Sequence, residues 1–302
     1  MPISDNPTVT VLMGVYNAAM YLRESIDSIL SQTFTDFEFL IYNDGSTDNT
    51  AEIVRSYTDS RILFFDNPIN RSVSPNMNEG IERTRGRYIV RMDGDDLADP
   101  ERIAKQVAYM DAHPEVGLCG SAVRYFGASN SLIQLPEDNA TIQQTMWLHN
   151  SFYQPSVIIR TSVLRENGLR YDRQYEFAED YKLWSDMCAV TQVHNLTEPL
   201  LNYRIHPHQI SRRQTLGQQQ VCGRIRREQM SRLHIQILPE QEHAFELLTI
   251  DTRWPDLQPA DYGALASLLD NLGAQAQHIG IPTEVVYPRL AGQWIGILGA
   301  TR

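Results

Sequence analysis

Hydrophobic residues in the first hundred positions form short continuous runs, separated by segments in which they recur every three or four residues. Residues 8–15, 37–42, 62–65 and 87–92 are rich in β-branched and aromatic side chains, which predicts four buried strands. The segments between them have the periodicity of amphipathic helices, and Gly86 ends the last of them. Near-continuous apolar strands separated by helices predict an α/β fold with a mainly parallel sheet and helices on both faces.

The pattern becomes less regular in the second third of the chain, where strand-like and helix-like stretches follow one another as in an α+β half. In the C-terminal part Gln, Arg and Glu dominate, and apolar residues recur at helical spacing. We therefore predict a domain over residues 1–210, with halves over 1–98 and 99–210, followed by a mostly helical C-terminal extension over residues 211–302.

The composition is that of a globular protein without a general affinity for polyanions. The chain has 302 residues, 42% of them hydrophobic and 21% charged, and a formal net charge of −11. This charge argues against a nucleic-acid partner, because such proteins present a broad basic face. Cys119, Cys188 and Cys222 form no C-x-x-C motif, which argues against a zinc site or a disulfide framework. Neither a signal-peptide pattern nor an apolar run long enough to span a bilayer is present, so we expect a cytoplasmic protein.

The strand predicted over residues 87–92 ends in a sequence with three acids, Asp93-Gly94-Asp95-Asp96. Three carboxylates at one strand end repel one another, and this is costly unless a cation or hydrogen-bond donors offset the repulsion. Gly94 allows a sharp turn and the close approach of a ligand. The acidic tetrad therefore predicts a divalent cation with oxygen ligands, shared with a phosphate-bearing substrate. A helix cap is the alternative, but Asp99 followed by Pro100 forms a better one.

Polar and aromatic residues also follow other predicted strands. Tyr16 and Asn17 come after the first strand, and Asp44 comes after the second. Open parallel sheets bind ligands beyond the carboxyl ends of their strands, so these residues and the acidic tetrad are expected to share one site. Asp44 can accept a hydrogen bond from a nucleobase or stabilise a turn, and Tyr16 can stack on a base or pack in the core. Their convergence on one edge favours the binding roles.

A second pair of acids, Glu179 and Asp180, begins a predicted helix. The helix dipole favours acids there, which is a structural explanation for both. The functional hypothesis is that Asp180 acts as general base on an acceptor hydroxyl while Glu179 binds or orients that acceptor. Trp184 lies one turn later on the same face and either forms the floor of a sugar site or packs in the core. His206, in a proline-containing loop, is either a metal ligand or a solvated side chain.

Taken in order, these stretches resemble the inverting family 2 glycosyltransferases of the GT-A fold. The resemblance covers roughly residues 8–211, and the ordered set of matches is specific. It implies a nucleotide-sugar donor, most often a UDP-sugar, with Mn²⁺ or Mg²⁺ as cofactor and inversion at the anomeric carbon. The matching stretches are Val9–Asn17, Tyr42–Asp48, Met92–Asp96, Gln154–Ser156, Ala178–Trp184 and Tyr203–His206.

The resemblance also implies roles for individual residues. Tyr16 and Asp44 match uracil-binding positions, Asp93 a ribose or metal contact, Asp95 the metal ligand and Asp180 the base. The expected metal ligands are Asp95 and His206. The residues expected to bind the nucleotide sugar are Val15, Tyr16, Asn17, Asp44, Arg71, Asn78, Asp93 and Gly94.

One position departs from the family pattern. Many members carry an arginine where this chain has Met77, two residues before Glu79 in the sequence Asn76-Met77-Asn78-Glu79-Gly80. We expect Arg71 to supply the missing cation to the nucleotide.

These matches predict a metal-dependent hexosyltransferase that moves a sugar from a UDP-sugar to an acceptor hydroxyl in cell-surface polysaccharide or glycan assembly. The half over residues 1–98 would bind the nucleotide sugar, and the half over 99–210 the acceptor. One alternative is a sugar-1-phosphate nucleotidyltransferase, although such enzymes normally carry a glycine-rich loop with a basic residue after the first strand. The other alternative is a non-catalytic nucleotide-sugar-binding protein.

The start of the predicted extension is basic in an otherwise acidic chain. Anionic headgroups attract such clusters, which predicts peripheral contact with the inner face of the membrane and a lipid-linked glycan acceptor. A solvated helix face, or a surface that forms a homo-oligomer, is the alternative. The cluster consists of Arg212, Arg213, Arg224, Arg226, Arg227 and Arg232.

Overall fold

The computed structural model describes residues 6–207, 209, 215–250, 257–282, 284–288 and 290–292. The chain divides into two compact units, Met1–Asn139 with Phe152–Pro207, and Ala140–Ser151 with His208–Arg302. The predicted domain boundary at residue 210 stays a prediction, because the compactness of two units does not show that each folds on its own. None of the described helices is long and apolar enough to cross a bilayer.

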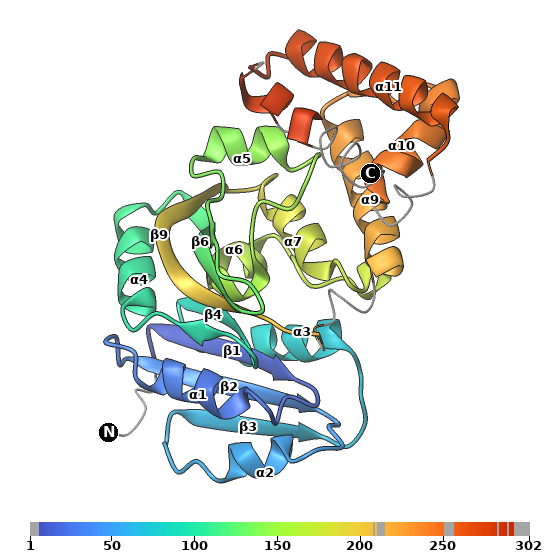
Figure 1. Ribbon diagram of the computed structural model, residues 1–302. Coiled ribbons are helices and arrows are strands. Elements are labelled where there is room, and N and C mark those ends of the chain that lie inside the picture. The colour runs from blue at the N-terminus through green and yellow to red at the C-terminus, as the bar shows by residue number, and fades with distance from the viewer. Residues whose placement is uncertain are drawn as a thin grey trace. The chain divides into compact units, whose positions relative to one another are not determined.

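In the first unit, nine strands of the described chain form one mixed sheet (Figure 1). They lie in the order β3-β2-β1-β4-β8-β6-β9-β5, with β7 beside β6. The first four are joined by parallel pairings, whereas β8 is antiparallel to both of its neighbours. The predicted fold class is therefore confirmed. The strands are β1 (Val9–Val15), β2 (Phe37–Asp44), β3 (Ile62–Asn67), β4 (Tyr88–Asp93), β5 (Leu97–Ala98), β6 (Val116–Gly127), β7 (Leu132–Ile133), β8 (Ile158–Arg160) and β9 (Gln192–Ile205).

The register of the parallel strands brings their carboxyl ends together. Val15 of β1 lies opposite Asn43 of β2, and Gly14 of β1 lies opposite Asp93 of β4. β1 is central and almost wholly buried, which explains why its sequence is apolar on both faces. The positions that the sequence singles out after three different strands therefore share one edge of the sheet.

Helices cover both faces of this sheet. Val11 and Met13 belong to the same core cluster as Ile26 of α1 (Leu22–Leu30). Leu12, between them, lies against Gly80 of α3 (Val73–Arg83), where an added Cβ would come within 2.3 Å of the leucine side chain. Successive strand residues point to opposite faces, so α1 and α3 lie on opposite sides of β1. The unit also contains α2 (Thr50–Arg55), α4 (Arg102–Ala112), η1 (Gln154–Ser156), α6 (Thr161–Glu166), η2 (Arg173–Tyr175) and α7 (Glu179–Met187).

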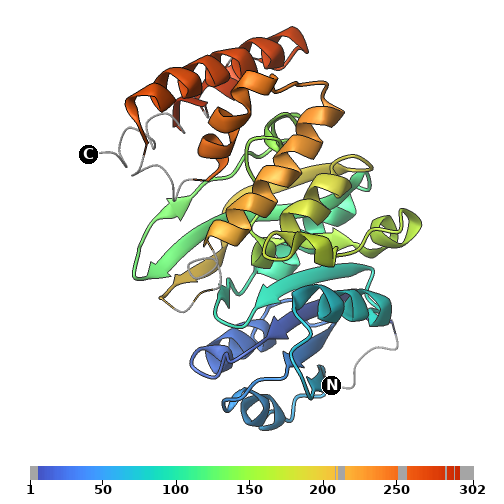
Figure 2. The same cartoon turned by 90° about the vertical axis from the view of Figure 1, so that its right-hand side faces the viewer.

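The second unit is helical, as predicted for the C-terminal part of the chain. Its helices after residue 214 are drawn in orange and red in Figure 2. Met230, Phe245 and Leu268 from three of these helices share a core with Trp147. The sequence did not indicate that residues 140–151 would join this unit. Its elements are α5 (Asn139–Thr145), α9 (Thr215–Arg232), η3 (Pro239–Gln241), α10 (Glu242–Thr249) and α11 (Pro259–His278).

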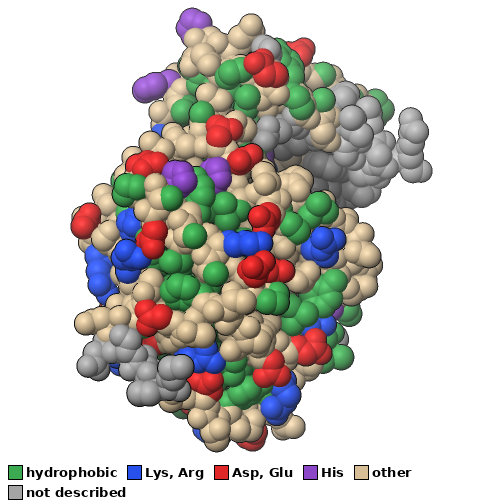
Figure 3. Space-filling model, turned by 90° about the vertical axis from the view of Figure 1, so that its left-hand side faces the viewer, with side chains coloured by type: hydrophobic (Ala, Val, Ile, Leu, Met, Phe, Trp, Pro, Cys, Tyr) green, Lys and Arg blue, Asp and Glu red, His purple; other side chains and the backbone are tan. Residues whose placement is uncertain are grey.

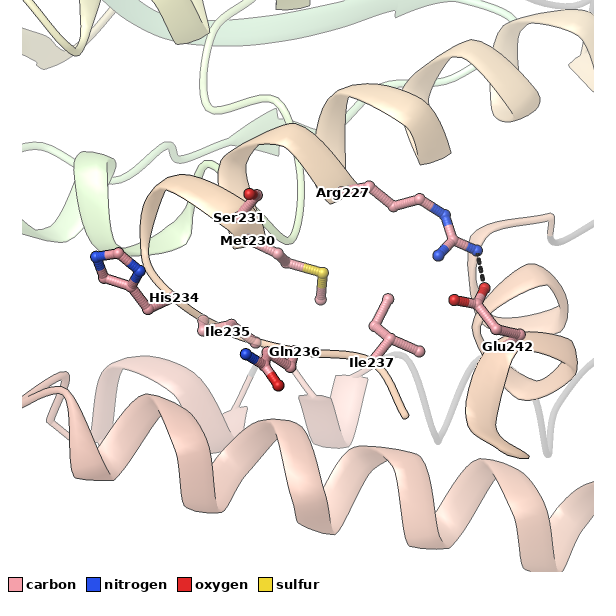
Figure 4. Close-up of a pocket in the computed structure, with 8 residues that line it drawn as sticks. All are labelled: Arg227, Met230, Ser231, His234, Ile235, Gln236, Ile237 and Glu242. Atoms are coloured by element: carbon pink, nitrogen blue, oxygen red, sulfur yellow. Dashed lines mark ion pairs between the residues drawn. The ribbon is translucent and has the colours of Figure 1, made fainter. Parts of the chain in front are cut away.

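Charged side chains of both signs are interspersed on the face shown in Figure 3. On that face, the described residues form no continuous basic surface of the kind that nucleic-acid binding requires. Of the predicted basic cluster, Arg212 and Arg213 lie outside the described residues, and Arg227 pairs with Glu242 at 2.6 Å. A pocket of about 280 Å³ lies beside this ion pair (Figure 4). Residues of the second unit alone line it, and none of the predicted site residues is among them.

Candidate active site

The loop after β1 is joined to the loop after β2 by Asn17. The side-chain oxygen of Asn17 accepts a hydrogen bond from the backbone N–H of Thr47 at 2.8 Å, and its own N–H donates to Ser46 Oγ at 2.9 Å. Asn17 has a φ of 49°, a left-handed conformation that asparagine tolerates better than most residues. Tyr16 is about half exposed (49%), whereas Val15 is buried. Asn17 thus fixes a loop that presents an accessible tyrosine ring at this edge.

Asp44 ends β2 next to the loop that follows β3. Its Oδ1 accepts a hydrogen bond from the backbone N–H of Arg71 at 2.8 Å. Gly45 has a φ of +70°, and a Cβ there would lie 2.6 Å from the backbone carbon of Ile69, so glycine alone allows this approach. The Arg71 guanidinium pairs with Glu79 of α3 at 2.8 Å. Arg71, which precedes α3, is therefore held beside Asp44 by a partner on that helix.

The segment of α3 that departs from the family pattern packs inward. Met77 is fully buried, and a Cβ on Gly14 would lie 2.9 Å from its Cε. Asn78 uses both ends of its amide on one residue, because Nδ2 donates to the Tyr171 carbonyl at 2.8 Å and Oδ1 accepts from the Tyr171 N–H at 2.9 Å. A direct contact of Asn78 with a nucleotide stays a prediction, since both polar atoms of its side chain bind the Tyr171 backbone.

Asp93, the first acid of the tetrad, lies beside the buried Arg91. The Arg91 guanidinium is 3.1 Å from Asp93 Oδ1. Desolvation raises the pKa of Asp93 to about 6, Arg91 opposes this rise, and the charges of Asp95 and Asp180 add to it. Since such charge effects weaken with distance, Asp180 lies near Asp93.

Asp95 and His206 are in direct contact although 111 residues separate them in the sequence. β5 pairs with the end of β9, Leu97 opposite Asn202, and this pairing brings the loop after β9 against the tetrad. His206 Nε2 lies 2.9 Å from Asp95 Oδ2, and its ring packs on Tyr21 with the centroids 4.8 Å apart. The structure thus brings the two predicted metal ligands together.

Asp96 is completely buried, unlike the other acids of the tetrad. Its Oδ1 accepts a hydrogen bond from the Arg204 N–H at 2.8 Å, and its Oδ2 has no hydrogen-bond partner among the described residues. Desolvation raises the pKa of Asp96 well above its usual range. Gly94 fits the same tight turn, because a Cβ there would lie 2.8 Å from Val15 Cγ1. Asp96 therefore ties the tetrad to β9.

The acids of α7 differ in their surroundings. Glu179 is 7% exposed, and its Oε2 has no hydrogen-bond partner in the described part of the chain, whereas Asp180 is only partly buried. Burial raises the pKa of Glu179 to about 7, and the charge of Asp180 adds to the rise. Trp184 is fully buried and packs edge-to-face on Tyr171 with the ring centroids 6.2 Å apart. This is the core-packing alternative for Trp184, and it leaves no exposed surface for the predicted acceptor contact.

We expect Glu179→Gln to flatten the pH dependence of stability. Glu179 binds its proton more tightly in the folded chain, so unfolding releases a proton between the ordinary pKa of 4.5 and the folded pKa of about 7. The free energy of unfolding contributed by this group therefore falls as pH rises through that window, by an amount on the order of 2–3 kcal/mol. Urea unfolding at pH 5 and pH 8 would measure it. Equal pH slopes in the wild type and the variant would contradict the assignment.

Two buried arginines near the acids were missed by the sequence analysis. Arg91 and Arg102 are at most 2% exposed. Arg91 Nη1 donates to the Leu12 carbonyl, and Arg102 Nη2 donates to the Arg91 carbonyl at 2.9 Å. Burial lowers the pKa of Arg102 to about 9. An arginine inside the apolar strand β4 was the available signal, because a buried charge is costly without acids nearby.

Comparisons with known proteins agree with this geometry. The model of glycosyl transferase family 2 matches residues 10–167. An uncharacterized glycosyltransferase of Haemophilus influenzae is 33% identical over 238 residues, which are 74% of each chain. The O-antigen biosynthesis glycosyltransferase WbnJ of Escherichia coli is 32% identical over 208 residues, 66% of this chain and 80% of that protein.

Two solved structures share the fold. TarS 1–349 of S. aureus in complex with UDP-GlcNAc has a TM-score of 0.64 at 16% identity, over 97% of this chain and 89% of that one. The mannosyltransferase PcManGT of Pyrobaculum calidifontis, in complex with GDP-Man and Mn²⁺, has a TM-score of 0.60 at 17% identity, over 100% and 89%. These likenesses concern the fold alone. The family match, which spans more than half of the chain, and the sequence relatives do not favour a nucleotidyltransferase or a non-catalytic binder: the chain belongs to glycosyl transferase family 2 and is a glycosyltransferase.

Proposed function

We propose that this glycosyltransferase moves a sugar from a UDP-sugar to an acceptor hydroxyl, with inversion at the anomeric carbon. The observation that carries the proposal is the contact between Asp95 and His206 at the carboxyl edge of the sheet, with Asp93 beside them and the charge of Asp180 close enough to raise the pKa of Asp93. They come from three segments that are far apart in the sequence. Acids gather in this way, at a cost in free energy, where a cation or a ligand offsets their repulsion.

The donor would lie across the ends of β1, β2 and β4. The exposed ring of Tyr16 can stack on uracil, and Asp44 can accept a hydrogen bond from a base N–H. Asp93 would hold the ribose, with Val15 and Gly94 closely packed beneath it. TarS, which has been solved with UDP-GlcNAc, shares this fold and supports a UDP-sugar as the donor to test first.

Three further residues predicted for the donor site have partners within the protein. Asn17 joins two loops, Arg71 pairs with Glu79, and Asn78 holds Tyr171. Their proposed role is to support the residues that touch the donor. Arg71 would reach a diphosphate only by leaving its ion pair with Glu79.

Asp95 and His206 are proposed to hold the divalent cation. A carboxylate oxygen and an imidazole nitrogen that meet at 2.9 Å suit Mn²⁺. Among the described residues no group of three or more His, Cys, Asp or Glu could hold a metal, so phosphate oxygens and water would complete its coordination, as is usual beside nucleotide phosphates. When bound, such a cation neutralises charge on a departing diphosphate. The Mn²⁺ described for PcManGT, which shares the fold, supports this proposal.

Asp180 is proposed as the general base. Its carboxylate takes the proton of the acceptor hydroxyl as the hydroxyl oxygen forms a bond to the anomeric carbon and the bond to the UDP oxygen breaks. A single displacement of this kind inverts the anomeric centre. The leaving group departs as an anion, so no general acid of the protein is required. Glu179, whose pKa is raised to about 7, is protonated at lower pH and can then donate a hydrogen bond to the acceptor.

The acceptor is proposed to be a glycan or a lipid-linked glycan in cell-surface polysaccharide assembly. WbnJ, named for O-antigen biosynthesis, supports this class of acceptor. Under this proposal the enzyme works in the cytoplasm at the inner face of the membrane. The extension over residues 211–302 would supply the membrane contact or the surface of a homo-oligomer, beside a catalytic domain over residues 1–210.

A donor screen tests the proposal. The 302-residue protein would be incubated with UDP-glucose, UDP-galactose, UDP-GlcNAc and GDP-mannose, each with Mn²⁺ or with EDTA. Release of the nucleoside diphosphate would be measured with and without glycan acceptors. We expect release from one or more UDP-sugars that requires Mn²⁺ and rises with acceptor. Release from GDP-mannose alone would overturn the assignment of Asp44 and Tyr16 to uracil. Equal release with EDTA would overturn the metal site.

A further inference from the structure

The segment between Tyr171 and Ala178, which leads into α7, is linked by hydrogen bonds to α3 and its N-cap at two points. At its beginning, Asn78 makes two hydrogen bonds to the backbone of Tyr171, at 2.8 and 2.9 Å. At its end, Ser72 Oγ donates to Glu176 Oε1 at 2.8 Å. These contacts join stretches that lie 93 and 104 residues apart in the sequence.

In the second of these contacts, Ser72 does not make the helix-capping hydrogen bond expected at its position. Ser72 occupies the N-cap position of α3, where serine normally accepts a hydrogen bond from the first turn, yet its side chain makes no capping bond. Its hydroxyl reaches across to Glu176 instead. The hydroxyl of Ser72 is therefore used for a distant carboxylate and not for the first turn of its own helix.

Backbone strain lies at both ends of this tie. Ser72 has φ 72° and ψ 173°, a region that only glycine adopts readily. Phe177, directly after Glu176, has a φ of 74°, which is unusual for a bulky residue. Such conformations persist only where surrounding contacts hold them, and they are concentrated at functional sites.

The tie connects the two halves of the candidate active site. Ser72 directly follows Arg71, whose N–H binds Asp44 at the donor edge. On the other side, Phe177 makes a backbone hydrogen bond to Glu179 that lowers the pKa of this carboxyl against the effect of burial. Asp180 follows at once. One short path of contacts therefore runs from the donor-side loop to the carboxylate pair of α7.

We propose that Ser72, Asn78 and Glu176 are positioning residues that set the place of Asp180 relative to the donor. The proposal rests on the proposed function, in which Asp180 is the base. The strained Ser72–Glu176 tie fixes the end of the segment next to α7, and Asn78 fixes its start. A general base must lie within hydrogen-bond reach of the proton it takes, and small misplacements of such a group cost large factors in rate.

Four variants of the 302-residue protein test the Ser72–Glu176 contact. Glu176→Ala and Ser72→Ala remove it, and we expect kcat for sugar transfer to fall roughly 10- to 100-fold while the Kd for UDP stays within about twofold. Glu176→Gln keeps an oxygen that can accept from Ser72 and should restore most of kcat. Ser72→Gly loses the hydroxyl but relieves the strain, so it should lose kcat as Ser72→Ala does, with a higher melting temperature than that variant.

Glu166→Ala, in an exposed position at the end of α6, is the control for loss of a carboxylate and should leave kcat unchanged. Circular dichroism would confirm that each variant is folded, which is expected because the tie lies at an exposed site. An unchanged kcat in Glu176→Ala, or a kcat in Glu176→Gln as low as in Glu176→Ala, would overturn the positioning role. Asp180→Asn, measured in parallel, separates the hypotheses: if that variant remains active, the proposed base is wrong, whatever the tie does.

Discussion

Replacing Asp180 with asparagine is expected to reduce the rate of sugar transfer by a factor of about 10²–10⁴. Asparagine keeps the size of the side chain but cannot take the proton from an acceptor hydroxyl. Binding of UDP should stay within about twofold of the wild type, since Asp180 acts on the acceptor and only its charge reaches Asp93. Initial rates with a saturating donor, together with calorimetric titration of UDP, would measure both quantities.

Asp186→Asn is a matched control on the same helix. Asp186 pairs with Lys182 at 2.7 Å and belongs to no part of the proposed site. We expect this variant to keep its activity. Loss of UDP affinity in Asp180→Asn with transfer retained would reverse the assignment and place Asp180 in the donor site.

Replacing Asp95 with asparagine is expected to remove the effect of Mn²⁺ on UDP binding. The amide lacks the negative charge that a divalent cation requires, and a charge-assisted contact of this kind corresponds to a loss of about 10–100-fold in the affinity for UDP measured with Mn²⁺. With EDTA, UDP should bind the variant and the wild type equally. His206→Ala should give a smaller loss of the same kind, because its imidazole lies 2.9 Å from Asp95.

Titration calorimetry of UDP with and without Mn²⁺ makes this test independent of turnover. Asp99→Asn serves as the control, since its side chain accepts a hydrogen bond from the Glu101 N–H at 3.0 Å in the turn that begins α4. If Mn²⁺ strengthens UDP binding to Asp95→Asn as much as to the wild type, the cation has other ligands.

The positions of Tyr16, Asp44 and Asp93 at one edge could be predicted from the sequence. Each follows a run of apolar residues, and in a parallel sheet such runs end at the same side, as the pairing of Gly14 with Asp93 confirms. The family could also be predicted, because its motifs lie within short stretches of sequence. These features depend on local patterns, which tertiary contacts modify little.

The partners of individual side chains could not be predicted in the same way. Asn78 and Met77 lie in a stretch that suggests nucleotide contact, yet α3 turns Met77 into the core and Asn78 toward Tyr171. Trp184 lies one helical turn after Asp180, the proposed general base, but the packing of α7 buries it. A side chain's periodicity indicates a helix and a face; what that face meets depends on segments far away in the sequence.

By itself, the sequence determined the alternation of strands and helices, the edge of the sheet that carries the acids, the helical C-terminal part and the glycosyltransferase family. Only the tertiary structure decided that His206 meets Asp95, that Asp96 is a buried tie to β9, and that Ser72 holds Glu176. The physical reason is one of range. Hydrophobic periodicity and strand ends depend on neighbouring residues, so they can be identified from the sequence. A contact between residues 104 or 111 positions apart forms only when sheet pairing and helix packing bring the two segments together.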